Sequence, residues 1–242
     1  MSARPSHAMV LAAGLGKRMR PITDTMPKPL VSIAGKTLLD WGLDSLAAVS
    51  VKEAVVNVHY LPDQIIAHVK CRAQPQIIIS DERDVLLDSA GGIVKARPLL
   101  GNDPFYILNA DTFWIDRSVP NLERLALAWR PDSMDILLML ASLDQATGHS
   151  GGTDFLLGKN GRLQRAKGDP AGLIYAGAAI ASPKLFADAE AVPHSLNAYF
   201  DRAIEQGRLF GLQMEGSWIT VGTPDAIAPA EAAVARAAGH RA

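Results

Sequence analysis

The chain has 242 residues, of which 48% are hydrophobic and 20% are charged, and its formal net charge is −1. This length and composition predict one globular domain with a substantial core. The near-zero net charge excludes a global basic field for nucleic acid, so any site for an anion has to be local.

Membrane and secretion signals are missing from the sequence. No apolar run reaches the roughly 20 residues that a membrane-spanning helix needs. Residues 1–7 lack the apolar core of a signal peptide, and the single cysteine, Cys71, is expected in a helix without a disulfide partner. We therefore expect a cytoplasmic protein with no membrane partner. Its expected parts are a flexible N-terminus over residues 1–8, a single domain over 9–237 and a flexible tail over 238–242.

Strand patterns and helix patterns alternate along the chain. Strands are expected at residues 9–12, 54–58, 76–80, 105–109, 135–141, 174–181 and 209–214. Helices are expected at residues 38–49, 61–69, 91–99, 122–129, 196–205 and 224–237. This alternation predicts a Rossmann-like, three-layer α/β/α fold with a mostly parallel mixed sheet. Residues 144–172 are rich in Gly, Asp, Lys and Gln, which favours a lid or small hairpin beside the site.

A glycine-rich turn follows the first expected strand directly, at residues 13–16. Glycine has no Cβ, so backbone N–H groups of such a turn can approach phosphate oxygens closely. Lys17 and Arg18 follow, and Lys28 stands between two prolines that restrict its backbone. The combination indicates a site for a polyanion such as a triphosphate.

Two other glycine-loop patterns do not fit. A dinucleotide-binding loop needs a third glycine where Met19 stands, and the Gly-Lys-Ser/Thr of a P-loop is missing. A simple strand-to-loop turn with solvated cations is the alternative. The surrounding Arg18, Pro21 and the Pro-Lys-Pro at 27–29 favour the phosphate site.

Asp111 follows the expected strand at 105–109. Ligands of open α/β sheets gather beyond the carboxyl ends of the strands, so Asp111 and the glycine-rich turn are expected at one edge. A turn or helix-capping role is the alternative for this carboxylate. A Mg²⁺ ion often uses one or two carboxylates and takes its other ligands from phosphates and water. We therefore expect Asp111 to be a metal ligand.

Residues 9–30 resemble the signature of the sugar-1-phosphate nucleotidyltransferases, Leu-Ala-x-Gly-x-Gly-x-Arg-Met-x-Pro-Leu-Thr, a spacer, then Pro-Lys-Pro-Leu. Nearly every fixed position matches, with Ile22 where Leu is usual. The Asn-Ala-Asp at 109–111 also resembles the Asn-Gly-Asp of the family. The resemblance extends over most of the chain. It is closest to a short bacterial branch that includes uridylyltransferases for N-acetylmuramate 1-phosphate and proteins described as mannose-1-phosphate guanylyltransferases.

The resemblance implies attack by a sugar 1-phosphate oxygen on the α-phosphorus of a nucleoside triphosphate, with release of pyrophosphate. The second pKa of a phosphate monoester is about 6, so the attacking phosphate is ionised near neutral pH and needs no general base. Catalysis then consists of positioning and charge stabilisation. Arg18 is expected on the β- and γ-phosphates, and Lys28 on the α-phosphate and the sugar phosphate. Asp111 is expected to hold Mg²⁺.

The resemblance also implies two sets of binding residues. The expected nucleotide-binding residues are Leu11, Ala12, Ala13, Gly14, Gly16, Lys17, Gly91 and Gly92, although the loop at 88–92 departs from the Glu-Thr-Gly-Gly-Gly of the family in its first three residues. The expected sugar-binding residues are Asn109, Asp154, Lys167, Tyr175 and Gly177. A solvated surface role stays open for Asp154 and Lys167. Asn57 and His59 are similar to an Asn-His pair of the uridylyltransferase branch, with a structural role open for the histidine.

One departure concerns the metal. The family usually has Trp-x-Asp-Val-Gly-Thr near its end, and here residues 218–223 place Thr220 at the position of that second carboxylate. Asp225 is expected to cap the last helix and not to replace it. We therefore expect weaker Mg²⁺ binding, mainly by Asp111 and substrate phosphates.

The first hypothesis is uridylyl transfer from UTP to N-acetylmuramate 1-phosphate, a nucleotide-sugar reaction of cell-wall peptidoglycan recycling. The alternatives are guanylyl transfer from GTP to mannose 1-phosphate or a heptose 1-phosphate, cytidylyl transfer, and a nucleotide-binding regulatory protein without turnover. Either a monomer or a small homo-oligomer is compatible with the sequence.

Overall fold

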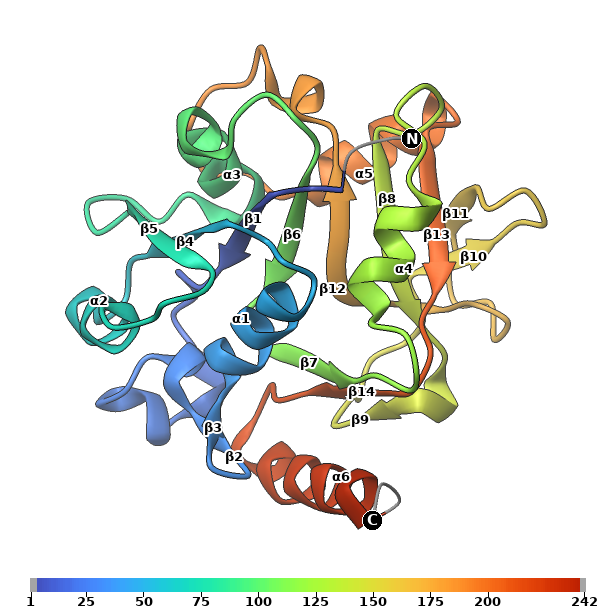
Figure 1. Cartoon of the computed structure of the whole chain (residues 1–242). Coiled ribbons are helices and arrows are strands. Elements are labelled where there is room, and N and C mark those ends of the chain that lie inside the picture. Colours follow the sequence, from blue (N-terminus) through green and yellow to red (C-terminus); the bar gives the residue numbers. More distant parts are fainter. Residues whose placement is uncertain (1–3, 240–242) are drawn as a thin grey trace.

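A seven-stranded sheet runs through the centre of the computed structural model, which describes residues 4–239 (Figure 1). Its strand order is β13-β8-β12-β6-β1-β4-β5. Within this sheet β12 pairs antiparallel with β6 and β8, whereas the other pairs are parallel. The predicted mostly parallel mixed sheet is thus confirmed. Its strands are β1 (His7–Leu11), β4 (Glu53–Val58), β5 (Gln76–Asp81), β6 (Phe105–Asn109), β8 (Ile136–Ala141), β12 (Ile174–Ala181) and β13 (Leu209–Gln213).

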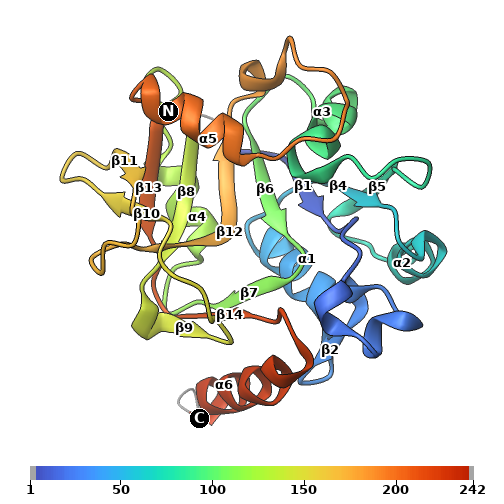
Figure 2. The ribbon, with the colours of Figure 1, turned by 180° about the vertical axis from the view of Figure 1, so that it is seen from behind.

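Helices cover both faces of this sheet (Figures 1 and 2). Neighbouring residues of a strand point to opposite faces. Val10 and Leu108 therefore lie in one core cluster, and Met9 and Ile107 in another. The first cluster is covered by α1 (Leu38–Ala48), α2 (Pro62–Val69) and α4 (Asn121–Ala128), and the second by α3 (Asp88–Leu100) and α5 (Asn197–Glu205). The predicted three-layer α/β/α arrangement is confirmed.

A second, three-stranded sheet lies below the main sheet in Figure 1 and was not expected from the sequence. Its strand order is β7-β14-β9, with β7 at Thr112–Ile115, β14 at Ser217–Thr220 and β9 at Ala146–Thr147. The final helix α6 (Ile227–Gly239) packs on it through a third apolar cluster. These strands are two to four residues long, so they carry too little alternation to be predicted.

Short elements complete the fold. Residues 144–172 contain the antiparallel hairpin of β10 (Phe155–Leu157) and β11 (Leu163–Arg165). A small ribbon pairs β2 (Ser32–Ile33) with β3 (Lys36–Thr37). The 3₁₀ turns are η1 (Lys17–Met19), η2 (Ile22–Asp24), η3 (Lys28–Leu30), η4 (Leu143–Gln145), η5 (Pro183–Phe186) and η6 (Pro224–Ala226).

Several local features differ from the sequence expectations. Strand β1 begins at His7, inside the stretch expected to be flexible, because its backbone pairs with β4 from Glu53 onward. Helix α6 extends to Gly239, so only residues 240–242 of the expected tail lie outside the described part. Helix α2 ends at Val69, which leaves Cys71 exposed in the following turn. Asp225 lies inside η6, whose N-cap residue is Thr223.

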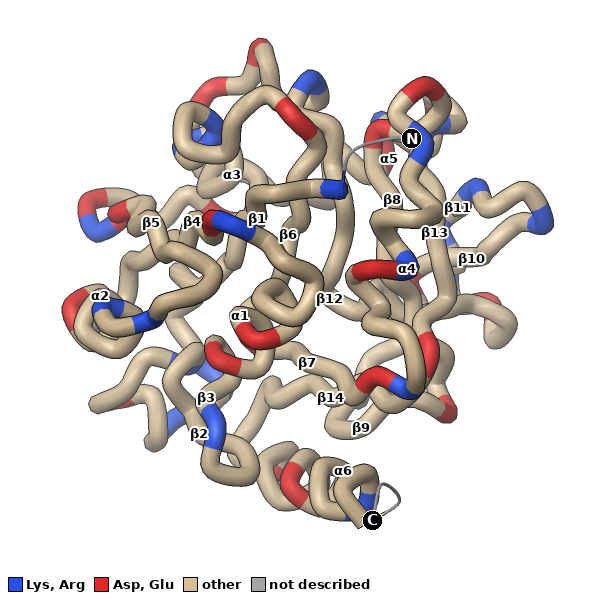
Figure 3. Tube along the Cα trace, viewed as in Figure 1, with Lys and Arg blue, Asp and Glu red and all other residues tan. Residues whose placement is uncertain are grey.

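Basic and acidic positions are interspersed along the trace in Figure 3, in keeping with the small net charge. Within residues 4–239, no helix combines the length and the apolar character needed to cross a bilayer.

Candidate active site

The carboxyl ends of three neighbouring parallel strands define the site. Strand β1 ends at Leu11 and leads into the glycine-rich turn, and β6 ends at Asn109 two residues before Asp111. Strand β4 contributes Asn57 near its end. Because these strands are neighbours in the sheet, their ends meet at one edge, as the sequence predicts.

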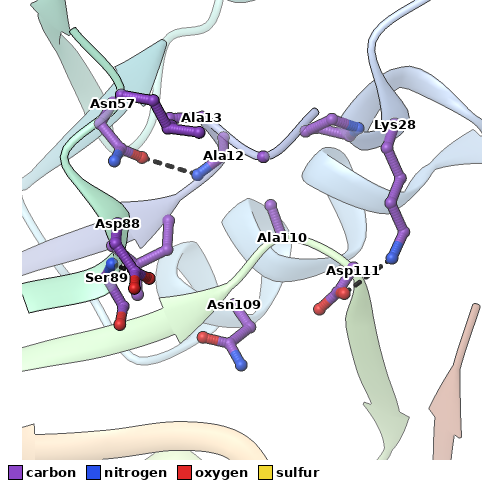
Figure 4. Close-up of a pocket in the computed structure, with 13 residues that line it drawn as sticks. Ala12, Ala13, Lys28, Asn57, Asp88, Ser89, Asn109, Ala110 and Asp111 are labelled. Atoms are coloured by element: carbon purple, nitrogen blue, oxygen red, sulfur yellow. Dashed lines mark hydrogen bonds and ion pairs between the residues drawn. The ribbon is translucent and has the colours of Figure 1, made fainter. Parts of the chain in front are cut away.

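A pocket of about 450 Å³, which we call the central pocket, opens at this edge (Figure 4). Figure 4 shows Asn57, Asp88 and Ser89 on one side of it, with Lys28 and Asp111 on the other. The glycine-rich turn runs between these two sides. The central pocket is lined by Leu11, Ala12, Ala13, Gly14, Lys28, Pro29, Asn57, Leu86, Asp88, Ser89, Asn109, Ala110 and Asp111.

The glycine-rich turn is fixed by a positive φ at Gly16. Its φ of 62° lies in the left-handed region, and an added Cβ would lie 3.0 Å from Thr23 Cγ2. The Thr23 hydroxyl also donates to the Gly16 carbonyl at 2.9 Å, and the Met19 N–H donates to the same carbonyl at 2.8 Å. A glycine is therefore needed at this position to start η1, which carries Lys17 and Arg18.

A pocket of about 250 Å³, the loop pocket, lies beside the central pocket. It is lined by Gly14, Gly16, Lys17, Arg18, Lys28, Asp111 and Gly222. Lys28 and Asp111 line both pockets. Their side chains form an ion pair, with 2.7 Å between Lys28 Nζ and Asp111 Oδ2. The loop pocket thus concentrates three cations around one carboxylate, a charge balance that suits a polyphosphate with a bound cation.

Asp111 is the carboxylate that lines both the central pocket and the loop pocket. No group of three or more His, Cys, Asp or Glu side chains within residues 4–239 is arranged to hold a metal ion. The Asp111 carboxylate is 38% exposed, and its Oδ1 accepts no hydrogen bond from these residues. One open carboxylate fits a Mg²⁺ ion that takes its remaining ligands from substrate phosphates and water. Thr220 contributes no carboxylate to help it.

A buried carboxylate lies behind the central pocket. Glu82 is 1% exposed, its Oε1 accepts from Asn57 Nδ2 at 2.8 Å, and its Oε2 accepts from the Leu87 N–H at 3.3 Å. Asn57 Oδ1 in turn accepts from the Ala12 N–H at 2.7 Å. This chain of hydrogen bonds ties the glycine-rich turn to the start of α3. Burial raises the pKa of Glu82, although the hydrogen bonds from Asn57 and Leu87 oppose that rise.

Glu82 was missed by sequence reasoning. A glutamate directly after an apolar strand is usually solvated, so nothing in its sequence position indicates burial. His59 makes a 2.7 Å contact through Nδ1 with the Glu82 carbonyl, which gives this histidine a structural partner.

The expected glycines of the 88–92 segment do not line the pocket. Helix α3 begins at Asp88, three residues earlier than expected, and its first turn is packed against residues 192–196. A Cβ at Gly91 would overlap the carbonyl oxygen of Val192. A Cβ at Gly92 would lie 2.7 Å from Glu82 Oε1. These two glycines permit close helix packing, and Asp88 and Ser89 line the pocket in their place.

The expected sugar-side residues are divided in space. Asn109, Asp154 and Tyr175 line a pocket of about 220 Å³, the hairpin pocket, between the β10–β11 hairpin, β12 and α5. Gly177 is buried, and an added Cβ there would meet Thr112 Oγ1 and Asn109. Lys167, with a φ of 49°, is exposed and lines none of the three pockets. The structure therefore brings three of these five residues together.

A family model described as nucleotidyl transferase matches residues 7–147, which include the glycine-rich turn, Lys28 and Asp111. The chain belongs to this family. It is 44% identical to the N-acetylmuramate alpha-1-phosphate uridylyltransferase of Caulobacter vibrioides, over 98% of this chain and all of that protein. It is 34% identical to the protein of the same name from Neisseria meningitidis, over 89% and 93% of the two chains.

Solved structures agree on the fold of this nucleotidyltransferase. The inositol-1-phosphate CTP transferase of T. maritima superposes with a TM-score of 0.76, covering 93% of this chain and 92% of the other. The two sequences are only 20% identical. That structural likeness supports the three-layer fold alone. The sequence identity to the two uridylyltransferases is the comparison that is relevant to the reaction.

Proposed function

We propose that this nucleotidyltransferase transfers a uridylyl group from UTP to N-acetylmuramate 1-phosphate, giving a nucleotide sugar and pyrophosphate. The observation that carries the proposal is the loop pocket, where Lys17, Arg18 and Lys28 surround Asp111 beside an open central pocket. The choice of substrates is supported by the two relatives of more than 30% identity, which both bear that name.

In this proposal the central pocket binds the nucleoside through the backbone of the glycine-rich turn. Leu11, Ala12, Ala13 and Gly14 are drawn from β1 and the turn, and Asn57 fixes the Ala12 N–H from behind. Asp88 and Ser89 face them across the pocket. The backbone at this place is held by buried hydrogen bonds, so it presents a preformed surface to the base.

The cations of the loop pocket act on the phosphates. Arg18 is suited to the β- and γ-phosphates, because a planar guanidinium binds two oxygens at once. Lys28 is suited to the α-phosphate and the incoming sugar phosphate as a compact charge. Asp111 would hold Mg²⁺, which supplies a positive charge for the oxygens of the triphosphate. The sugar phosphate oxygen attacks the α-phosphorus while the bond to pyrophosphate breaks, and no protein group needs to remove a proton.

Further parts of the proposal concern the whole chain. Residues 9–237 act as one domain, and residues 144–172, which include the β10–β11 hairpin, form a lid on the sugar side. In this proposal the enzyme acts in the cytoplasm in cell-wall sugar recycling, as a monomer or a small homo-oligomer.

The first experiment measures pyrophosphate release from UTP, GTP, CTP, dTTP and ATP against a set of sugar 1-phosphates, with Mg²⁺. We expect release from UTP with N-acetylmuramate 1-phosphate, and none from the Asp111→Ala variant. Release from GTP with mannose 1-phosphate instead would replace the proposed substrates. If no pair of nucleotide and sugar 1-phosphate releases pyrophosphate although nucleotide binding is measurable, a regulatory protein would be favoured.

A further inference from the structure

The hairpin pocket adjoins the central pocket, because Leu11, Ser89 and Asn109 line both. Beyond these shared residues it extends away from the loop pocket, toward the hairpin and α5. Its remaining lining residues are Asp154, Phe155, Arg165, Tyr175, Leu196, Asn197 and Phe200. A ligand of the central pocket can therefore extend a chemical group into the hairpin pocket. That group would lie away from the cations of the loop pocket, since the hairpin and loop pockets share no lining residue.

Arg165, at the end of β11, is held rigidly in the wall of this pocket. Its guanidinium carbon lies 4.8 Å from the ring centroid of Phe155 and 6.0 Å from that of Phe200. Its Nε donates to Asp201 Oδ1 at 2.7 Å, and its Nη2 donates to Asn197 Oδ1 at 3.0 Å. These contacts fix the plane of the cation, so little side-chain entropy remains to be lost on binding a ligand.

One nitrogen of Arg165 is left open. Nη1 donates no hydrogen bond to any of residues 4–239, and the side chain is 27% exposed. Asp201 offsets part of the charge, but its carboxylate is 56% exposed and therefore well screened by water. The open nitrogen carries two N–H donors of a charged group whose side chain lines the pocket.

The charged residues of the hairpin pocket indicate which kind of group it can bind. Arg165 is the one Lys or Arg side chain among its lining residues, and Asp154 is the one carboxylate. Asp154 Oδ2 accepts the Tyr175 N–H at 2.8 Å, and its other oxygen suits a sugar hydroxyl. Neutral hydroxyls are also served by Asn109 and Asn197, so they do not call for a fixed cation. A hydrogen bond from a guanidinium to a carboxylate is charge-assisted and therefore stronger than one to a neutral hydroxyl.

We propose that Arg165 is a specificity-determining residue that binds a carboxylate on the sugar of the acceptor. This inference rests on the proposed function, because the proposed acceptor, N-acetylmuramate 1-phosphate, carries a lactyl carboxylate. It identifies Arg165 as the residue that recognises this carboxylate. A sugar of the same ring without the acid would offer no carboxylate to the open Nη1, so the charge of Arg165 would be offset only in part, by the exposed Asp201. The enzyme would then select acidic sugar 1-phosphates over their neutral analogues.

The test compares N-acetylmuramate 1-phosphate with its lactyl carboxamide, which is neutral and nearly the same size, as acceptors for UTP. Hydrogen bonds to charged groups contribute enough for a preference of roughly 10- to 100-fold in kcat/KM for the acid. Most of this preference should appear in KM, because Arg165 is remote from the reacting phosphorus. In Arg165→Gln we expect the preference to disappear, because kcat/KM for the acid falls to the level of the carboxamide. Arg165→Lys should recover part of it.

The matched control is Arg162→Gln on the same hairpin. Arg162 lies over Phe210, with 5.8 Å from its guanidinium carbon to the ring centroid, and it does not line the hairpin pocket. It should keep the full preference for the acid. Equal losses with both acceptors in Arg165→Gln, or a preference that survives this change, would overturn the inference.

Calorimetric binding of the acid and the carboxamide, in the presence of α,β-methylene-UTP, separates the inference from the proposed function. If the wild type turns over neither acceptor but still binds the acid more tightly through Arg165, the reaction is wrong and the inference stands. If neither binding nor turnover distinguishes acid from carboxamide, the inference is wrong whatever the reaction.

Discussion

Lys28 Nζ lies 2.7 Å from Asp111 Oδ2, although 83 positions of sequence separate the two residues. Lys28 is only 12% exposed in its side chain, whereas Asp111 is 38% exposed. The pair therefore presents its carboxylate to the loop pocket and keeps the lysine in the wall. Each member holds the other in place in the wall that the two pockets share.

The first prediction concerns this pair. Lys28→Met should lower kcat by about 10²- to 10³-fold, the range seen when one preorganised charge-stabilising donor is removed. The reason is that no other Lys or Arg of residues 4–239 lines both the central and the loop pockets. Steady-state pyrophosphate release measures the effect, and the exposed Lys52→Met is the control. A loss confined to the KM for the nucleotide would contradict a role in the transition state.

The second prediction concerns the metal. Thr220 pairs with Thr112 across the second sheet, and the next N–H, of Val221, donates to the Asp111 carbonyl at 3.1 Å. A carboxylate at 220 would thus lie near Asp111, and added ligand charge raises the affinity of a site for divalent cations. Thr220→Asp should lower the Mg²⁺ concentration for half-maximal activity by roughly tenfold.

A magnesium titration of activity checks this, with Ser217→Asp at the far, exposed end of β14 as the control. An unchanged magnesium requirement in Thr220→Asp would count against the idea that this position weakens metal binding.

The third prediction follows from the raised pKa of Glu82. A carboxyl group whose pKa is raised in the folded state binds its proton more tightly there than in the unfolded chain. Its contribution to stability is therefore greatest at low pH, and it is lost as the pH rises from the ordinary value of a glutamate through the raised one. Unfolding free energies measured across that range should show this slope.

Glu82→Gln should remove this part of the pH dependence. It should also cost about 1–3 kcal/mol, because the amide cannot accept from both Asn57 and Leu87. The exposed Glu190→Gln serves as the control. The same pH slope in wild type and Glu82→Gln would show that other groups cause it.

The fourth prediction concerns Gly91, whose added Cβ would overlap the carbonyl oxygen of Val192. Gly91→Ala should force α3 away from the 192–196 segment and lower the unfolding free energy by about 1–3 kcal/mol. Thermal or denaturant unfolding measures the change. Gly152→Ala is the control, because nothing lies within 4 Å of its added Cβ. A variant as stable as the control would mean that the helix shifts without cost.

The fold was largely predictable from the sequence. The apolar runs that form β1, β4 and β6 have the length and composition of buried strands, and helical patterns separate them. Parallel strands with helical crossovers bring their carboxyl ends to one edge, so the meeting of the glycine-rich turn with Asp111 follows from the order of elements. Short pairings were not predictable, since β7 and β14 lie about a hundred residues apart and have only four residues each.

The sequence by itself determined the strand–helix order and the residue types of the glycine-rich turn, because these depend on local backbone and side-chain chemistry. The tertiary structure decided which residues line the same pocket and which are buried. It buried Glu82 behind Asn57, turned Gly91 and Gly92 into packing positions, left Lys167 outside the pockets and set Arg165 beside Asn197. These relationships depend on contacts between segments distant in the chain, and no local pattern specifies how such segments dock.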